Sequence, residues 1–232
     1  MDLLLESLKN GLIVSCQALY GEPLYSEAGG IMPLVAKAVL AGGAVGIRAN
    51  TPRDIREIRA VVDLPIIGLY KRNYEGYEPY ITPTLKEVEE VIDAGAEIVS
   101  IDCTNRPRAD GISLKEAIYQ IKRLHPKILI MADISNYEEG KAAFEYGADI
   151  IATTLNGYTP YTISANTDNY ELVSRLSKAC KAPVFAEGRI HYPCQAAKML
   201  EAGAWSVVVG GAITRPEEIT RRFVNEMKEV YV

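Results

Sequence analysis

The chain has 232 residues, of which 48% are hydrophobic and 24% are charged. This length predicts one large domain or two small ones, and the composition is typical of a soluble globular protein. A formal net charge of −5 argues against nucleic acid as a partner, because nucleic-acid binding usually requires a basic excess. It still permits a local basic pocket for a small anion.

The sequence carries no signal for export, membrane insertion or metal binding. The N-terminal segment MDLLLESLKN lacks the positive charge and the apolar length of a signal peptide, so we expect a cytoplasmic protein. No apolar run approaches the roughly 18 to 20 residues that span a bilayer. The only two histidines are far apart, which argues against a zinc site. Four widely spaced cysteines are expected to be reduced packing residues: Cys16, Cys103, Cys180 and Cys194.

An internal repeat is the most informative feature of the chain. Four times, a helix-like stretch ends at small residues and passes directly into an apolar, β-rich run. The four segments are LAGGAVGIRA (40–49), DAGAEIVSID (93–102), EYGADIIATT (145–154) and EAGAWSVVVG (201–210). Each carries a glycine where a helix would end in the left-handed conformation. The aligned glycines are Gly43, Gly95, Gly147 and Gly203.

Further strand candidates alternate with these repeats. They are LIVSCQ (12–17), DLPIIGLYK (63–71), HPKILIMAD (125–133) and APVFAEG (182–188), which bring the expected strands to eight. Segments 51–62, 82–95, 113–124 and 215–230 have amphipathic helical spacing, and Ser113 with Glu116 predicts a capping box. The pattern therefore predicts an α/β fold, a closed (β/α)8 TIM barrel of the phosphate-binding type, as a single domain over 1–232 with a short N-terminal helix. An open doubly wound sheet fits eight evenly spaced strands less well.

The barrel prediction places the active site at the C-terminal ends of the strands. Polar residues of both charge signs gather at those ends, whereas the opposite ends carry Ala, Pro and aliphatic residues. The strand-end residues are Ser15, Gln17, Arg48, Asn50, Lys71, Arg72, Asp102, Asp133, Thr153, Thr154, Asn156, Glu187, Arg189, Gly210 and Gly211.

The last two of these strand ends indicate a phosphate site. Glycine backbones and arginines follow strand 7 in AEGRI and strand 8 in VVGGAITRP, which leads into a short helix start. Exposed N–H groups there bind anions, and barrels often hold phosphate at this position. A tight turn at Gly210 and Gly211 is the simpler alternative.

Lys71 is the strongest candidate for proton transfer. It ends an apolar strand, and burial beside Arg48 and Arg72 would lower its pKa and give a neutral amine near pH 7. Position alone equally allows a lysine that only pairs with an acidic residue (Asp102, Asp133 or Glu187). Those aspartates are weak candidates for Mg²⁺ ligands.

Two further segments lie near the expected mouth. YKRNYEGYEPY (70–80) holds four tyrosines, and we interpret it as a lid or a subunit contact. His191 follows strand 7, where a surface or packing role is favoured over contact with a ligand.

At these residues the sequence resembles the N-acetylmannosamine-6-phosphate 2-epimerase family over nearly its whole length. The matching stretches are GLIVSCQA with GEPLY (11–25), GIRAN (46–50), Lys71-Arg72 with YITPT (80–84), SIDCTNRPR with DG (100–111), MADIS (131–135), ATTLNGYT (152–159), FAEGRI (185–190) and VVVGGAITRPEEIT (207–220). Tyr70 and Asn73 depart from the residues usual beside the lysine in that family.

The resemblance implies a cytoplasmic isomerase of amino sugar and sialic acid catabolism. It would invert C2 of N-acetylmannosamine 6-phosphate to N-acetylglucosamine 6-phosphate by deprotonation and reprotonation, without a cofactor or metal. The resemblance assigns catalysis to Lys71 and Glu187. It assigns substrate binding to Gln17, Arg48, Asp133, Thr154, Gly188, Arg189, Gly210, Gly211 and Arg215. It also implies a phosphosugar substrate and a homodimer.

Two other functions remain as alternatives. A ribulose-phosphate 3-epimerase shares the barrel and the phosphate site, but its metal ligands include two histidines that this chain lacks at strands 2 and 3. A non-catalytic sensor of a phosphorylated ligand is the second alternative, since one fold hosts many functions. Lys71 facing Glu187 would distinguish an enzyme from such a sensor.

Overall fold

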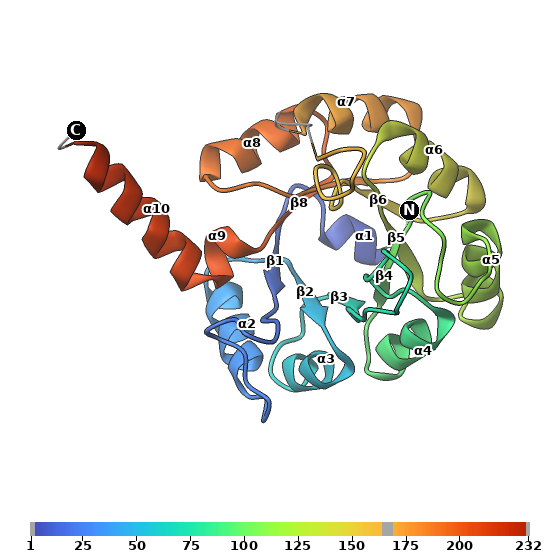
Figure 1. Cartoon of the computed structure of the whole chain (residues 1–232), viewed down its shortest axis with the longest axis horizontal. Helices are drawn as coiled ribbons and strands as arrows, with labels where there is room; N and C mark the ends of the chain where they lie inside the picture. The colour runs from blue at the N-terminus through green and yellow to red at the C-terminus, as the bar shows by residue number, and fades with distance from the viewer. Residues whose placement is uncertain (1–2, 164–168, 231–232) are drawn as a thin grey trace.

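The computed structural model describes residues 3–163 and 169–230 and contains a closed barrel of parallel strands (Figure 1). The strands are β1 (Leu12–Cys16), β2 (Gly46–Asn50), β3 (Ile66–Leu69), β4 (Ile98–Asp102), β5 (Leu129–Asp133), β6 (Ile150–Ala152), β7 (Val184–Glu187) and β8 (Ser206–Val209). Each strand pairs with the next, and β1 also pairs with β8, which closes the sheet. The (β/α)8 barrel predicted from the repeat is confirmed.

Helices connect the strands and cover the outside of the barrel (Figure 1). They are α1 (Leu3–Ser7), α2 (Ile31–Ala41), α3 (Pro52–Arg59), α4 (Leu85–Asp93), α5 (Leu114–Leu124), α6 (Tyr137–Tyr146), α7 (Tyr170–Ala179), α8 (Pro193–Glu201), α9 (Gly211–Thr214) and α10 (Pro216–Glu229). None of the helices in the described ranges is long and apolar enough to cross a membrane.

Side-chain caps fix where several of these helices begin. Thr84 and Glu87 form a complete capping box at α4. At α5 the Ser113 side chain accepts a hydrogen bond from the N–H of Glu116, but the Glu116 carboxylate accepts one from Gln120 instead of returning to Ser113. The capping box predicted at α5 is therefore only half formed.

Two apolar layers hold the barrel together. The outer layer fills the space between strands and helices, and the inner layer fills the barrel itself. Inner-layer residues include Leu5, Leu8, Ile13, Ile67, Ile98, Met131, Ile150, Phe185 and Val208. Leu5 and Leu8 come from α1 and the turn after it, and the Trp205 indole N–H donates a 2.9 Å hydrogen bond to the Leu5 carbonyl. The N-terminal end of the barrel is thus closed by its own chain, which leaves the other end for a ligand.

The cysteines are free thiols in the structure. Cys16, Cys103 and Cys180 are buried, which agrees with packing roles, whereas Cys194 is exposed. Burial raises the pKa of the Cys16 thiol to about 12, so this thiol stays protonated and unreactive at neutral pH.

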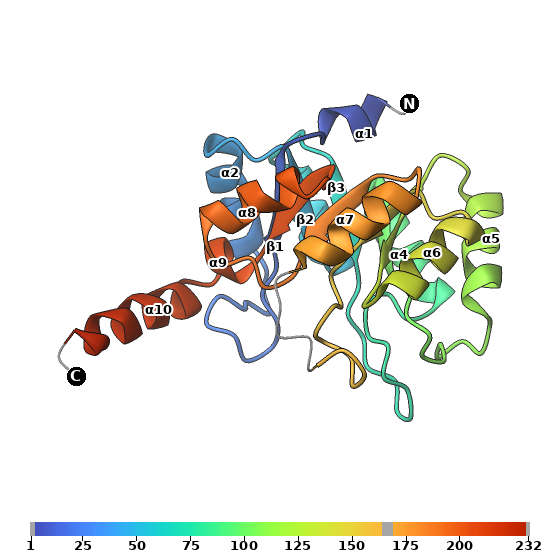
Figure 2. The same cartoon turned by 90° about the horizontal axis from the view of Figure 1, so that it is seen from above.

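Two segments project from the barrel. The mouth loop, which we define as residues 70–84 between β3 and α4, extends beyond the C-terminal strand ends (Figure 2). Helix α10 points away from the barrel, and none of its described residues is buried (Figures 1 and 2). The mouth loop lies over the predicted site, whereas α10 leaves its apolar residues in solvent.

Candidate active site

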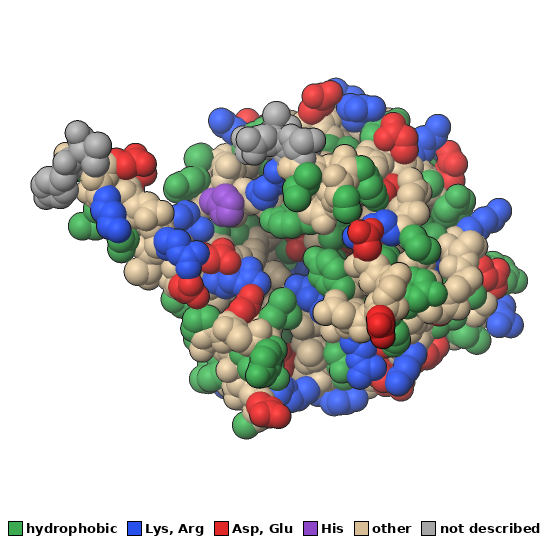
Figure 3. Space-filling view, viewed as in Figure 1, with side chains coloured by type: hydrophobic (Ala, Val, Ile, Leu, Met, Phe, Trp, Pro, Cys, Tyr) green, Lys and Arg blue, Asp and Glu red, His purple; other side chains and the backbone are tan. Residues whose placement is uncertain are grey.

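A cavity of about 380 Å³ opens at the C-terminal ends of the strands. Figure 3 shows this face hollowed, with Lys and Arg side chains around the hollow. The cavity is large enough for a small ligand such as a phosphorylated sugar. The predicted site residues that line it are Gln17, Arg48, Lys71, Thr154, Glu187, Gly188, Arg189, Gly210, Gly211 and Arg215. Asp133 does not line the cavity.

Lys71 lies just beyond β3 and is held through its backbone. Its N–H donates a 2.9 Å hydrogen bond to the Asn50 side chain, and the residue pairs with Ile81 across the mouth loop. Its ammonium group makes no ion pair within the described ranges. Burial, together with the positive charges of Arg48 and Arg215, lowers the pKa of Lys71 to about 8. A substantial fraction of Lys71 is therefore neutral near pH 7 to 8.

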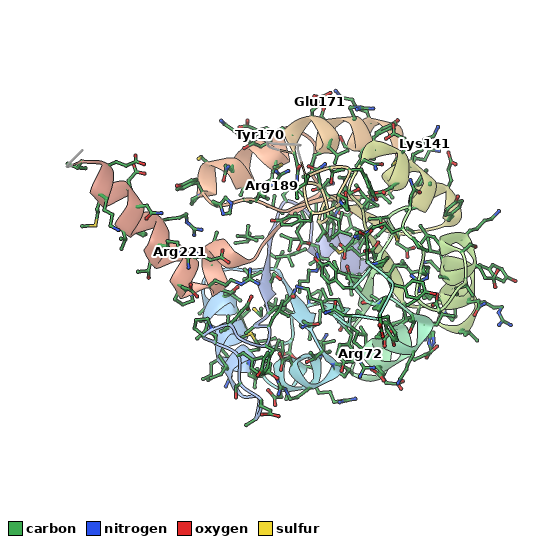
Figure 4. All side chains as sticks on the ribbon, viewed as in Figure 1. Arg72, Lys141, Tyr170, Glu171, Arg189 and Arg221 are labelled. Carbon is green, nitrogen blue, oxygen red and sulfur yellow. The ribbon has the colours of Figure 1, made fainter. Side chains whose placement is uncertain are left out.

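Arg72 was predicted to help lower the pKa of Lys71, and this prediction is wrong. Arg72 turns out of the cavity toward the Glu87 carboxylate, at 3.4 Å, and stacks on the Tyr70 ring, at 4.7 Å. Figure 4 shows Arg72 beside α4, across the barrel from Arg189. The backbone alternates direction after β3, so consecutive residues point to opposite sides.

Arg48 occupies the floor of the cavity and is only 1% exposed. Its guanidinium donates hydrogen bonds to Asp133 at 2.6 Å, to Ser100 at 3.1 Å and to the Glu187 carboxylate. Asp133 is fully buried beneath it. Asp133 thus holds Arg48 from below and does not line the cavity, whereas the resemblance implied that it lines the sugar site.

Glu187 faces the cavity from β7. Its carboxylate accepts hydrogen bonds from Arg48 and, at 3.2 Å, from the Thr154 hydroxyl. Burial raises the pKa of Glu187, and the neighbouring Asp133 charge acts in the same direction against the influence of Arg48. A carboxyl group in these surroundings is able to hold or release a proton during a reaction.

Asp102, the other candidate partner for Lys71, is also engaged by an arginine. Arg106 forms a 2.7 Å ion pair with it, and the Thr104 hydroxyl donates a 2.6 Å hydrogen bond. No group of three or more potential metal ligands occurs in the described part of the chain. Arginines form ion pairs with Asp102, Asp133 and Glu187. The amine of Lys71 therefore faces the cavity without an ion-pair partner among the described residues.

Gln17 contributes an unsatisfied acceptor to the cavity. Its side-chain nitrogen donates a 2.7 Å hydrogen bond to the Ser15 hydroxyl. Its side-chain oxygen is buried and has no partner among the residues that the structure describes. An unpaired buried acceptor is costly, so this oxygen is well placed to accept a hydrogen bond from a ligand hydroxyl.

Glycine backbones and two arginines form the β7–β8 end of the cavity. Gly188 has φ of 103° and Arg189 has φ of 57°, so the chain turns sharply after β7. The helix start expected at Arg215 and Pro216 is preceded by the short helix α9. The Arg189 guanidinium donates a 3.1 Å hydrogen bond to the Asn156 side chain. Arg215 pairs with Glu22 at 2.9 Å.

Several residues that line the cavity were not predicted from the sequence as site residues. The structure adds Tyr80, Ile81, Tyr158 and Glu218, together with His191, which lies at the rim and is exposed. The tyrosine-rich segment predicted as a lid does contain Tyr80, but its spacing did not indicate which tyrosine turns inward. His191 was assigned a surface role, and it is both exposed and adjacent to the cavity.

The charges around the cavity favour an anion. Lys71, Arg48, Arg189 and Arg215 line it, against two carboxylates from Glu187 and Glu218. This local excess contrasts with the net charge of −5 of the whole chain. A low-dielectric recess with an excess of one sign of charge concentrates ligands of the opposite sign.

The fold and cavity define a (β/α)8 barrel whose strand-end cavity is lined by a lysine, two glutamates and three arginines. A family model described as "Putative N-acetylmannosamine-6-phosphate epimerase" matches residues 32–229. The chain belongs to this family, which confirms the resemblance seen in the sequence.

Relatives that carry the corresponding 2-epimerase name cover nearly the whole chain. One from Caldanaerobacter subterraneus subsp. tengcongensis is 55% identical over 229 residues, which is 99% of this chain and 95% of the relative. One from Clostridioides difficile is 50% identical over 225 residues, which is 97% of this chain and 99% of the relative.

Solved structures agree with the family assignment. The N-acetylmannosamine-6-phosphate 2-epimerase from Clostridium perfringens is 47% identical, covers 97% of this chain and 96% of its own, and superposes with a TM-score of 0.91. A thiamine phosphate pyrophosphorylase from Pyrococcus furiosus has a TM-score of 0.63 at 19% identity and covers 94% of this chain and 93% of its own. That second likeness reflects the shared barrel alone.

Proposed function

We propose that this protein inverts C2 of N-acetylmannosamine 6-phosphate to give N-acetylglucosamine 6-phosphate. The observation that carries the proposal is the amine of Lys71, which faces a cationic cavity and has its pKa lowered to about 8. Arginines form ion pairs with the neighbouring carboxylates. Family membership supports the same reaction.

The two ends of the cavity suggest how the substrate lies. The 6-phosphate binds at the β7–β8 end, where Arg189 and Arg215 meet the backbones of Gly188, Gly210 and Gly211. A phosphate held there directs C1 and C2 across the barrel toward Lys71. The unpaired Gln17 oxygen then accepts a hydrogen bond from a sugar hydroxyl.

The reaction begins when neutral Lys71 removes the proton from C2 of the open-chain sugar. The C2–H electron pair moves into the C1–C2 bond, and the aldehyde oxygen takes up the negative charge. The positive charges of Arg48 and the newly formed Lys71 ammonium stabilise this enolate. Return of a proton to the opposite face of C2 completes the inversion with no net gain or loss of protons.

Glu187 is the second group that transfers protons to and from the substrate. Its raised pKa and its contacts with Arg48 and Thr154 support a carboxylate that exchanges a proton with substrate hydroxyls. Two routes fit this arrangement. In one, Lys71 and Glu187 serve the two faces of C2; in the other, Lys71 serves both faces after the intermediate turns.

Proton NMR with N-acetylmannosamine 6-phosphate in D₂O tests the proposal, without added metal or nucleotide. We expect N-acetylglucosamine 6-phosphate to accumulate with deuterium at C2. Unlabelled product would indicate a shielded proton returned by a single base. Binding without conversion would contradict the proposal and favour the sensor alternative.

The second part of the proposal is that the protein forms a homodimer, and the exposed apolar face of α10 is the evidence for it. Its exposed face includes Phe223, 68% exposed, and Met227, 65% exposed. In a (β/α)8 barrel a helix normally covers the outside of every strand. Beside β8 and β1 the barrel instead has apolar hollows lined by residues such as Val39, Leu200 and Ile213. The α10 helix of a second copy provides an apolar face that fits this uncovered side.

Sedimentation measurements test the dimer. We expect the purified protein to have twice the mass of the chain, and Phe223→Glu with Met227→Glu to reduce it to a monomer. Tyr119→Glu, at a 60% exposed site on α5, is the matched control and leaves the mass unchanged. A wild-type monomer would contradict this part of the proposal without affecting the reaction.

A further inference from the structure

An apolar wall lies directly beside Lys71 and belongs to the mouth loop. Ile81 pairs with Lys71 in antiparallel fashion, and the Tyr80 carbonyl accepts a 2.9 Å hydrogen bond from the Arg72 N–H. Both Tyr80 and Ile81 line the cavity. Ile81 is 2% exposed and packs with Leu69, so it forms a fixed backing for this wall.

The Tyr80 side chain reaches over the charged floor of the cavity. Burial raises the pKa of Tyr80, and the nearby charge of Asp133 raises it as well, against the opposite effect of Arg48. The hydroxyl therefore stays protonated at neutral pH. This hydroxyl makes no hydrogen bond to any residue in 3–163 or 169–230. It is therefore a donor available to a ligand.

The other apolar lining lies at the opposite end. Burial raises the pKa of Tyr158, and the charges of Arg189 and Arg215 act to lower it. Tyr158 therefore lies near the arginines assigned to phosphate binding. Ile190 and Ala212 follow β7 and β8 and also lie at that end. Val208 and Val209 line the cavity from β8 itself. Tyr80 and Ile81 are therefore the apolar lining residues that the mouth loop places beside Lys71.

The proposed reaction puts a specific group against this wall. A base removes a proton efficiently only when it lies about 3 to 3.5 Å from the reacting atoms. The substrate's acyl group is joined to C2 through a single nitrogen, so it lies within a few bond lengths of Lys71. An acyl group presents an apolar chain and a carbonyl acceptor, which complement the ring and the hydroxyl of Tyr80.

We propose that Tyr80 recognises the N-acyl group of the substrate, with its ring against the acyl chain and its hydroxyl donating to the acyl carbonyl. The inference rests on the proposed epimerase function and adds the residue that sets acyl-chain length. Ile81 closes the pocket behind the acyl chain, which restricts it to a short one.

Acyl-length selectivity tests this inference. The kcat/KM values of wild type and variants are measured with N-acetyl- and N-butanoylmannosamine 6-phosphate. Wild type prefers the N-acetyl substrate, and Tyr80→Ala lowers the acetyl-to-butanoyl ratio about tenfold because space opens for the longer chain. Tyr80→Phe removes only the hydroxyl, so KM rises about two- to tenfold for both substrates while the ratio stays constant.

Two matched tyrosines serve as controls. Tyr77→Ala, in the same loop at a 41% exposed site outside the cavity, leaves activity and ratio unchanged. Tyr158→Ala lowers kcat/KM for both substrates without changing the ratio. A ratio within twofold of wild type in Tyr80→Ala would overturn the inference. Absence of turnover in wild type would instead overturn the proposed function.

Discussion

The side-chain carbonyl of Asn50 accepts a 2.9 Å hydrogen bond from the backbone N–H of Lys71. Asn50 ends β2 and is 4% exposed, so a buried side chain of one strand fixes the residue that follows the next. On the other side of Lys71, Tyr70 and Thr82 exchange hydrogen bonds of 3.0 and 3.1 Å across the mouth loop. Lys71 is thus held at the cavity by its backbone, and its amine needs no partner to keep it there.

Replacing Asn50 by alanine is expected to reduce kcat more than it changes KM. Loss of the hydrogen bond frees the backbone of Lys71, and small displacements of a catalytic group cost up to about 100-fold in rate. Steady-state kinetics with a melting curve separate this effect from unfolding. Asn73→Ala, at an exposed position in the mouth loop, is the matched control and retains wild-type kinetics. An equal loss in both variants would contradict a specific role for Asn50.

Lys71→Ala is expected to abolish turnover while the substrate still binds. A positioned general base contributes about 10²- to 10⁴-fold to a rate. The groups assigned to phosphate binding lie at the other end of the cavity, so calorimetry should still detect the substrate. Lys86→Ala, at a largely exposed lysine on α4, serves as the control. Activity above a tenth of wild type in Lys71→Ala would exclude Lys71 as the base.

The pH dependence follows from the lowered pKa of Lys71. The base must be neutral to accept the C2 proton, and its pKa is about 8. Below that value kcat/KM should fall about tenfold for each pH unit, and above it the rate should level off. Rates measured from pH 6.5 to 9.5 avoid most of the titration of the substrate phosphate, whose pKa is about 6. A profile flat between pH 6.5 and 8 would contradict a neutral lysine base.

The barrel was predictable because each repeat contains the same local pattern, a helix end followed directly by a strand. Glycines such as Gly147 end a helix with positive φ, and an apolar strand begins at once. The strand-end rule then placed Lys71 and Glu187 among the candidate site residues, and both line one cavity although they are distant in the chain.

What the sequence left open was the direction of individual side chains. Lys71 and Arg72 are adjacent and both basic, yet only Lys71 lines the cavity, whereas Arg72 points to the opposite side and pairs with Glu87 on α4. Likewise, Asp133 and Glu187 each looked available to Lys71 until the structure showed Arg48 between them. Such choices depend on contacts between residues far apart in sequence, which no local pattern contains.

Glu218 is expected to oppose phosphate binding. Its carboxylate lies against Gly211, where an added Cβ would collide with it, and it pairs with Arg215 at 3.5 Å. A phosphate at Gly211 and Arg215 must therefore approach this negative charge. Replacing Glu218 by glutamine should tighten the binding of inorganic phosphate about three- to tenfold, a modest gain because the carboxylate is partly exposed and screened by solvent.

Calorimetric titration with inorganic phosphate measures this effect, and the KM for the phosphorylated substrate should fall in parallel. Glu217→Gln is the matched control: Glu217 neighbours Glu218 on α10 but pairs with Arg221 and does not line the active-site cavity. Phosphate affinity in that variant should equal that of wild type. Weaker phosphate binding in Glu218→Gln would show the opposite relationship, in which Glu218 orients Arg215 for the phosphate and its charge is outweighed by that alignment.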